Sequence, residues 1–432
     1  SSITTIGKGS FENCSSLASL SLPTSLTSLG SYAFSGCASI PSVTIPVGVT
    51  VLYDDVFNKC TSLATVTING NVTSIGFEAF RECAFAEIVL PSSVETIKGA
   101  AFRGCKNLTS IIIPDATTTI GEAAFFDCTA LGNVSVSDSV TSVGKSAFKN
   151  NNDLTVSIRY LSGTIADSML EQQGVCHVVI DENITAVGDK VFAFCYDLET
   201  ITYGENTVNN GEFLFSPSIV SIGDEAFKDA TLLRNLLVPD TIQSIGTNAF
   251  YNSIESPYNC NDVTVTFYYV AGSIAADILK SQKVSHIVVN DNIHTLGDKA
   301  FNSCDILETV SLPDTITTCG SDVFAASSGA VTAYFRGVDG TVDANVYKAK
   351  TKGLTYLVFD ENVNTIGESA FANTNTVKGI IVNDTDLIDN YAFANSTSLD
   401  GVVIVKAGTV DDYAFNNCNG LDYVEIGTAE RI

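Results

Sequence analysis

The strongest constraint on this chain is a short motif that returns about every 23 residues. The sequence AFSGC at 33–37 recurs as AFREC at 79–83, AFRGC at 101–105 and AFFDC at 124–128. A period of about 20 to 50 residues is typical of solenoids, because such short units bury their apolar faces only by stacking on their neighbours. The anchoring phenylalanines of the first part are Phe11, Phe34, Phe57, Phe80, Phe102, Phe125 and Phe148.

One repeat shows how a single coil is built. It reads Leu17-x-x-Leu20-x-Leu22-Pro23-x-x-Leu26-x-x-Leu29-Gly30-x-x-Ala33-Phe34-x-x-Cys37. The alternation predicts a short strand that turns its leucines inward and its serines outward. The proline ends this strand because it cannot donate to a ladder. The glycine permits a bend before the Ala-Phe pair, where we expect a short helical or 3₁₀ turn.

Beyond Phe148 the period is modulated. The gaps from Phe148 to Phe192, Phe250 to Phe301 and Phe324 to Phe371 are about two periods wide, so each is expected to hold a variant coil. In these coils the Ala-Phe turn is replaced by a helix-compatible stretch such as Ile274 to Lys283, which we place on the convex side. The segment from Gly204 to Phe215 is interpreted as an inserted, protruding loop.

Fifteen phenylalanine anchors and three variant coils predict about 18 coils. No linker rich in proline, glycine or serine interrupts them. The sequence therefore predicts one solenoid domain over residues 1–432, with regular coils in 1–150 and variant coils and an insertion at 204–215 within 151–432. A parallel β-sheet is expected on the concave face, with short turns and 3₁₀ or helical segments on the convex face.

The repeated unit resembles the BspA-like class of leucine-rich repeat, found in surface proteins of bacteria and some protozoa. The resemblance rests on the Leu-x-x-Leu-x-Leu-Pro and Ile-Gly-x-x-Ala-Phe-x-x-Cys elements and covers nearly the whole chain. It implies a right-handed curved superhelix and an association with adhesion to host proteins or other cells. It implies no particular ligand-binding residues, and fold alone does not fix activity.

Charge excludes several classes of partner. Acidic residues outnumber basic ones 48 to 22, and the formal net charge of -26 repels nucleic-acid backbones and anionic lipid surfaces. Lysines and arginines are scattered singly, and no apolar run approaches the ~20 residues of a membrane span. We therefore expect no nucleic-acid partner and no membrane insertion by this segment.

Nine of the twelve cysteines lie three residues after an anchor phenylalanine. Metal sites use convergent ligands at short spacings, and parallel side chains on stacked coils suit disulfides badly. We expect these ladder cysteines to be buried free thiols that act as small hydrophobes. A bridge among Cys176, Cys260 and Cys319, which lie off the ladder, remains open.

The sequence offers little for catalysis. His177 and His286 occupy equivalent positions of two variant coils, as duplication of a structural unit produces. Calcium binding by the acidic stretches at Asp181, Asp291 and Asp360 is the alternative to their being solvated turn residues. No nucleophile elbow, phosphate loop or zinc-helix motif occurs, so no catalytic residue, cofactor or metal is predicted.

The outward strand positions are the expected partner-binding surface, because they form a regular sheet without obstructing loops. Most carry small hydroxyl groups, which also simply suit exposed strands. Arg234 and Asn235, beside the insertion, form the most distinctive patch. The candidate residues are Ser19, Ser21, Ser42, Thr44, Thr65, Thr67, Ser110, Asn133, Ser135, Thr200, Thr202, Arg234, Asn235, Thr309 and Ser311.

These observations favour a non-enzymatic binding module, on a cell surface or secreted, that adheres to an extracellular protein ligand through the concave strand face. A structural coat or spacer protein and a carbohydrate-binding module are the alternatives. Exposed aromatic side chains on the strands would favour the carbohydrate alternative.

The chain opens inside a repeat, at Ser1 to Gly7, and stops soon after Ile426. A solenoid closes its ends with atypical polar coils, because an uncapped strand exposes core and backbone groups. We therefore expect an excised segment of a longer protein, capable of end-to-end self-association.

Overall fold

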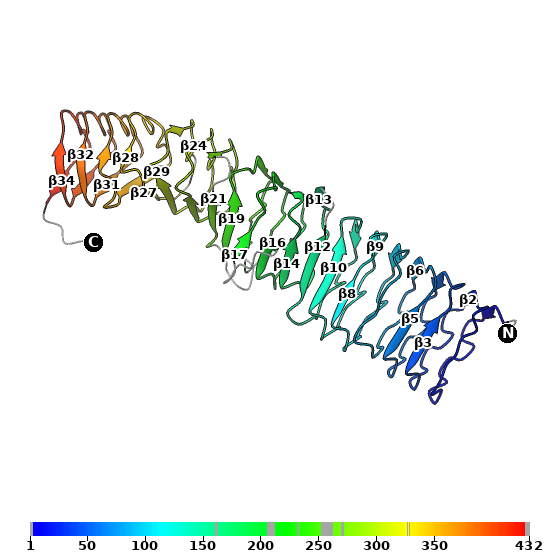
Figure 1. The fold of residues 1–432 in the computed structure, drawn as a ribbon. Coiled ribbons are helices and arrows are strands. Elements are labelled where there is room, and N and C mark those ends of the chain that lie inside the picture. The colour runs from blue at the N-terminus through cyan, green and yellow to red at the C-terminus, as the bar shows by residue number, and fades with distance from the viewer. Residues whose placement is uncertain are drawn as a thin grey trace. The chain divides into compact units, whose positions relative to one another are not determined.

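The computed structural model describes residues 3–159, 163–204, 212–230, 232, 234–251, 262–268, 272–325, 327 and 329–427. The chain divides into two compact units. Unit 1 comprises Ser1–Val208 with Ala226–Leu232, and unit 2 comprises Asn209–Glu225 with Leu233–Ile432. Each unit is a stack of coils whose strands run side by side (Figure 1). The assignment of one domain to residues 1–432 stays a prediction.

A coil of unit 1 has three sides: a longer strand, a strand of two to four residues, and the Ala-Phe turn. We call the first the long-strand face and the second the short-strand face. The long strands are β3 (Ser42–Ile45), β5 (Thr65–Ile68), β8 (Ser110–Ile112), β10 (Asn133–Ser137), β12 (Thr155–Arg159), β14 (His177–Ile180) and β16 (Thr200–Tyr203). The short strands are β1 (Thr5–Ile6), β2 (Ser28–Leu29), β4 (Val51–Leu52), β6 (Ser74–Ile75), β7 (Thr96–Ile97), β9 (Thr119–Ile120), β11 (Ser142–Val143), β13 (Gly163–Ile165) and β15 (Ile184–Val187).

Unit 2 has the same plan. Its long strands are β17 (Glu212–Leu214), β19 (Asn235–Pro239), β21 (Thr264–Tyr268), β23 (His286–Val289), β25 (Thr309–Pro313), β27 (Val331–Arg336), β29 (Leu354–Phe359), β31 (Gly379–Val382), β33 (Gly401–Ile404) and β35 (Tyr423–Ile426). Its short strands are β18 (Ser221–Ile222), β20 (Ser244–Ile245), β22 (Ser273–Ile274), β24 (Thr295–Leu296), β26 (Thr318–Cys319), β28 (Thr341–Val342), β30 (Thr365–Ile366), β32 (Thr385–Ile388) and β34 (Ala407–Val410). The strand pairings are parallel, as the stacking of successive coils requires.

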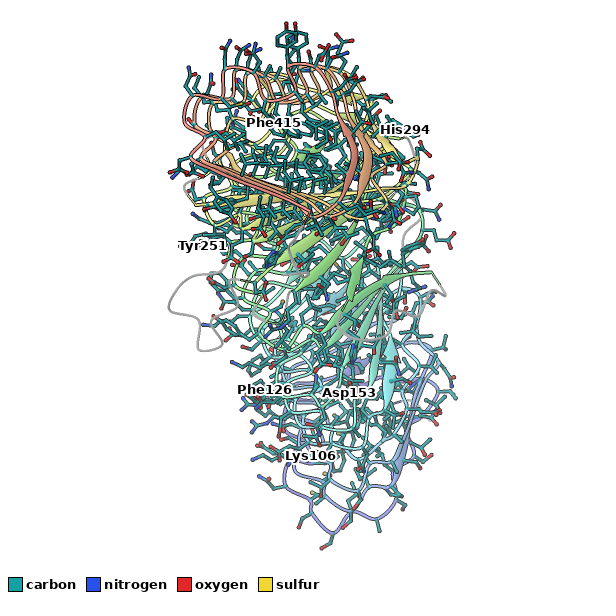
Figure 2. The ribbon with its side chains drawn as sticks, turned by 90° about the vertical axis from the view of Figure 1, so that its left-hand side faces the viewer. Lys106, Phe126, Asp153, Tyr251, His294 and Phe415 are labelled. Carbon is teal, nitrogen blue, oxygen red and sulfur yellow. The ribbon has the colours of Figure 1, made fainter. Side chains whose placement is uncertain are left out.

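The phenylalanine anchors form the core of the turn side. In unit 1 their rings stack coil upon coil, for example Phe34 on Phe57 at 5.6 Å between centroids and Phe102 on Phe125 at 5.2 Å. In unit 2, Phe415 lies within the ring of the backbone (Figure 2) and stacks on Phe393 at 5.1 Å. This ladder confirms the repeat register that the sequence predicts.

The turns themselves are not helical, which corrects the expectation of 3₁₀ or helical segments on this side. Among the described residues, those of the turns form no α- or 3₁₀-helix. The amide of Phe34 donates to the carbonyl of Val56 in the next coil, and Tyr32 and Gly36, on either side, have positive φ angles of 60° and 73°. Left-handed residues interrupt a right-handed helix, and inter-coil donation removes its hydrogen bonds. In the stretch from Ile274 to Lys283, Ile274 ends β22 and residues 276–281 form a turn, with Asp277 and Ser281 left-handed.

The three wide gaps do contain the expected variant coils. Leu170, Leu279 and Tyr347 stand at the anchor position and are fully buried, and each donates its amide to the following coil. At the start of the first variant coil the backbone ladder is replaced by a side chain. The Oε1 of Gln173 accepts the amide of Phe148 at 3.2 Å, and its Nε2 donates to the carbonyl of Gly144 at 3.1 Å.

Each variant coil also carries a long side chain that reaches back two coils from the end of its strand. Arg159 donates to the carbonyl of Ile113 at 3.0 Å, and Tyr268 donates to that of Phe215 at 2.6 Å. Arg336 donates to the carbonyl of Val289 and pairs with Asp291 at 2.6 Å. These side chains tie together coils that share no backbone pairing.

The interpretation of Gly204 to Phe215 as a protruding loop is wrong at its C-terminal end. Residues 205–211 lie outside the described residues, whereas Glu212–Leu214 forms β17, which pairs with β19. Phe213 and Phe215 are fully buried. Their two-residue spacing places both rings on the core side, so residues 212–215 form part of a coil and not of a protruding loop.

Candidate binding surface

The long-strand face alternates as predicted. Ser42 pairs with Thr65 and Thr44 with Thr67 across β3 and β5, while Val43 between them is buried. The outward side chains therefore form straight rows that cross the strands. Such rows present a surface without loops.

The candidate residues lie on this face with unequal exposure. Ser19 and Ser21 are exposed but lie outside the described strands, and Arg234 lies just before β19. Exposed candidates are Ser19, Ser21, Ser42, Thr44, Thr65, Thr67, Ser110, Asn133, Arg234 and Asn235; half-buried candidates are Ser135, Thr200, Thr202, Thr309 and Ser311. Within each unit the strand register brings these residues into shared rows. The insertion residues that would flank Arg234, 205–211, lie outside the described residues.

A histidine bridges adjacent strands on this face of unit 1. His177 contacts Thr200 Oγ1 through Nδ1 at 2.8 Å and Asp153 Oδ1 through Nε2 at 2.9 Å (Figure 2 labels Asp153). Both ring nitrogens therefore have hydrogen-bond partners beside the neighbouring coils. The arrangement orders the row of outward side chains.

Unit 2 repeats this arrangement. His286 contacts Thr309 Oγ1 at 2.6 Å and Asp262 Oδ1 at 3.0 Å. The same partners at equivalent positions are what duplication of a structural unit produces. Each Thr-His-Asp set stands on regular strands, with its threonine half-buried, and links three consecutive coils.

The most distinctive feature of the long-strand face is a groove in unit 2 that the sequence interpretation did not find. Its volume is about 400 Å³. Tyr334, Tyr356 and Tyr423 line it with side chains that are 43, 43 and 52% exposed, and Gly379 and Gly401 contribute no side chain. The remaining lining is Thr332, Leu357, Val358, Ile380, Ile381, Asp400 and Val403.

Strand register places the groove's residues in two rows. Tyr356, Gly379, Gly401 and Tyr423 follow one another across β29, β31, β33 and β35. The neighbouring row is Tyr334, Val358, Ile381, Val403 and Glu425. Large apolar side chains on the outward face of a sheet have no role in its core, so their clustering marks a contact surface.

Unit 1 carries a smaller apolar hollow of about 370 Å³ on its long-strand face. Val89 and Ile112, which are 83 and 66% exposed, line it. Arg159 and Asp115 also line it and pair with each other at 3.2 Å.

The thiols are unbridged, as the sequence predicts for the ladder. The eleven cysteines that the structure describes are all free, and Cys260 lies outside the described residues. Most ladder thiols donate to the carbonyl of the anchor residue one coil earlier, as Cys105 does to Phe80 at 3.1 Å. Burial raises the pKa of Cys60 and of Cys128 to about 12, so both remain protonated.

The acidic stretches considered for calcium have local hydrogen-bonding roles. Asp181 accepts the amide of Asn183 at 2.9 Å, Asp291 pairs with Arg336, and Asp360 accepts the amide of Asn362 at 2.9 Å. Over the described part of the chain, histidine, cysteine and carboxylate side chains do not gather in groups of three that could hold a metal. The same residues contain no helix long and apolar enough to cross a bilayer.

Comparison with known families decides what kind of repeat this is. The model of the BspA type leucine rich repeat region matches six times, over residues 1–109, 95–218, 205–267, 220–349, 272–400 and 341–432. The chain belongs to the BspA-type leucine-rich-repeat family. The resemblance drawn from the Ala-Phe-x-x-Cys motif is thereby confirmed.

Solved structures similar to this BspA-type chain include other leucine-rich repeat proteins. A leucine-rich repeat protein from Bacteroides ovatus is 20% identical, with 98% of this chain and 82% of that one covered and a TM-score of 0.34. A leucine rich cell surface protein from Faecalibacterium prausnitzii is 22% identical, with 80 and 86% covered and a TM-score of 0.26. Among curated proteins no match was found for the BspA-type chain.

Proposed function

We propose that this chain is a non-enzymatic binding module, displayed on a cell surface or secreted, that adheres to an extracellular protein through its long-strand face. The observation that carries the proposal is the tyrosine groove of unit 2. Tyrosines there stand outward on a sheet that has no structural use for them, and exposed tyrosine is enriched where proteins bind each other.

The rest of the face supports the same function. In unit 1 its rows of small hydroxyl side chains leave the strands accessible to a partner. Family membership supports adhesion as the outcome of such binding, and the repeat fold is typically a scaffold rather than an enzyme.

The test is a binding screen of the purified chain against extracellular-matrix and host cell-surface proteins. We expect at least one saturable interaction that survives physiological salt. Arg234→Glu in the same screen examines the patch predicted from the sequence: reduced affinity would place the contact there, and unchanged affinity would move it elsewhere on the face. Absence of any saturable protein ligand would contradict the proposal.

Carbohydrate binding is a second candidate, favoured by the same three tyrosines, because pyranose rings stack on exposed aromatic faces. A glycan array probed with the chain and with Tyr356→Ala separates the two. Glycan binding that the alanine variant loses would favour this candidate over a protein ligand.

A further inference from the structure

The groove of unit 2 contains a slot one strand wide. A Cβ atom on Gly379 would lie 2.9 Å from Cδ1 of Tyr356, so the tyrosine ring leans over that glycine and occupies the space above it. A Cβ atom on Gly401 would meet nothing within 4 Å. The open space therefore lies above Gly401, between the ring of Tyr356 on one side and β35, which carries Tyr423, on the other.

The dimensions of the slot suit a flat or slender group. Gly379 and Tyr423 lie two strand spacings apart, about 10 Å at the usual separation of paired strands. A planar group between two aromatic side chains fits such a gap, whereas a second packed sheet does not. The floor is backbone whose amides and carbonyls are engaged in the parallel ladder, so recognition must come from the walls and the rim.

The rim of the slot is acidic. Asp400 is the charged residue among the lining side chains, and Asp422 is exposed just before β35. Glu425 accepts a hydrogen bond from the hydroxyl of Tyr423. This hydrogen bond raises the pKa of Tyr423, which keeps the phenol neutral and its ring face electron-rich. Lys378 is the positively charged residue nearby. It is exposed and precedes the neighbouring strand, where its carbonyl accepts the amide of Asp400.

We propose that this slot binds a basic side chain, arginine or lysine, presented by an extended segment of a protein partner. The inference deepens the proposed function and rests on it. A guanidinium or ammonium group gains from aromatic faces and from the carboxylate of Asp400 at once. A chain of net charge -26 attracts such a segment at long range, whereas a neutral sugar gains nothing from this charge.

Gly401→Val provides a selective probe. The new side chain fills the slot while the position stays compatible with the strand, because valine favours strands and its Cβ atom meets open space. Gly132→Val is the matched control in unit 1: a Cβ atom there also meets nothing within 4 Å, and both glycines donate their amides to the preceding coil. Asp400→Asn removes the charge and keeps the shape.

The experiment measures binding of a fluorescein-labelled peptide of alternating glycine and arginine by fluorescence anisotropy. A peptide with citrulline in place of arginine serves as the neutral isostere. We expect the parent chain and Gly132→Val to bind the arginine peptide equally and at least about tenfold more tightly than the citrulline peptide. Gly401→Val should lose about tenfold in affinity, and Asp400→Asn should bind more weakly with a smaller salt dependence.

Equal binding of both peptides would overturn the proposal, since the positive charge would then contribute nothing to affinity. An arginine peptide whose affinity Gly401→Val leaves unchanged would also overturn it, since the charge of the whole surface would then explain binding. Binding of neutral chito- or cello-oligosaccharides that Gly401→Val abolishes, without binding of the arginine peptide, would assign the slot to a sugar instead. The peptide assay is independent of the protein screen, so a failed slot and a failed adhesion function give different results.

Discussion

The thiol of Cys60 donates a hydrogen bond to the carbonyl oxygen of Phe34, one coil earlier, with 3.2 Å between sulfur and oxygen. The same carbonyl already accepts the amide of Cys37, so the thiol supplies its second partner. Asn151 replaces cysteine in one coil of unit 1 and donates to the carbonyl of Phe125 at 3.2 Å. The recurring cysteine is therefore a small donor that ties each turn to the next.

Removing one such donor tests this role. Cys105→Ala leaves the buried carbonyl of Phe80 with one partner fewer and opens a small cavity, so we expect a loss of about 1 to 3 kcal/mol in unfolding free energy. Urea titration followed by circular dichroism measures it, and Cys14→Ala, at an exposed position, is the control. Identical unfolding of both variants would mean that neither the hydrogen bond nor the packing of the buried thiol stabilises the coil.

The raised thiol pKa values predict how stability depends on pH. An unfolded cysteine ionises near pH 8.5, whereas burial holds the pKa of Cys60 and Cys128 at about 12. Below the unfolded pKa both states are protonated and the stability is fully present. As the pH rises from about 9 towards 12, only the unfolded state releases the thiol protons. The unfolding free energy then falls by about 1.4 kcal/mol per pH unit for each such thiol.

Alkylation at pH 8 with iodoacetamide checks this protection. The exposed Cys14 should react in the native protein, whereas Cys60 and Cys128 should react only after unfolding in urea. Rapid native alkylation of either buried thiol, read by peptide mass spectrometry, would contradict the ladder.

The phenylalanine ladder predicts a large loss on truncation. Phe102 is fully buried, and its ring centroid lies 5.6 Å from that of Phe80 and 5.2 Å from that of Phe125. Phe102→Ala should therefore lower the unfolding free energy by about 3 to 5 kcal/mol. Phe77→Ala, at an exposed phenylalanine in the same region, should cost far less. Hydrogen exchange of the surrounding coils is the appropriate readout, because repeat arrays open locally.

Replacing Gln173 should lower stability by removing hydrogen bonds rather than packing. Where the backbone ladder is interrupted, the side-chain oxygen of Gln173 accepts the backbone amide of Phe148. Its side-chain nitrogen donates to the carbonyl of Gly144. Gln173→Ala should therefore lower thermal stability by the cost of unsatisfied buried groups, about 1 to 3 kcal/mol. The neighbouring Gln172 is exposed, and Gln172→Ala should melt close to the parent.

The core of this fold was predictable because its residues repeat, and the parts that were missed lack a periodic signal. The register of Phe102 follows from counting, and the rings stack where the count places them. The short-strand face was not predicted, because two-residue strands such as β2 (Ser28–Leu29) show no alternation. The strand β17 was interpreted as part of a loop because the residues before it are mostly polar. Phe213 and Phe215 nevertheless alternate as the buried residues of a strand do.

The groove was missed for a different physical reason. It begins at β27 and β29, in the loosest of the three variant coils, where the strand register shifts between Val331 and Thr332. The shift changes which residue of β29 faces outward, so counting from the anchors does not place Tyr356 opposite Thr332. The two-coil contact of Arg336 with Val289 likewise depends on side-chain reach rather than on sequence spacing.

The central claim is that the long-strand face binds the partner, and it is tested most directly by the affinity of two matched triple variants for a ligand found in the screen. One carries Thr44→Arg, Thr67→Arg and Thr332→Arg on the long-strand face; the other carries Thr50→Arg, Thr118→Arg and Thr317→Arg, which are exposed beside the short strands. Both change charge equally. We predict that the first loses binding by about a hundredfold or more while the second binds like the parent. Equal affinity of the two variants, or loss confined to the second, would contradict the account.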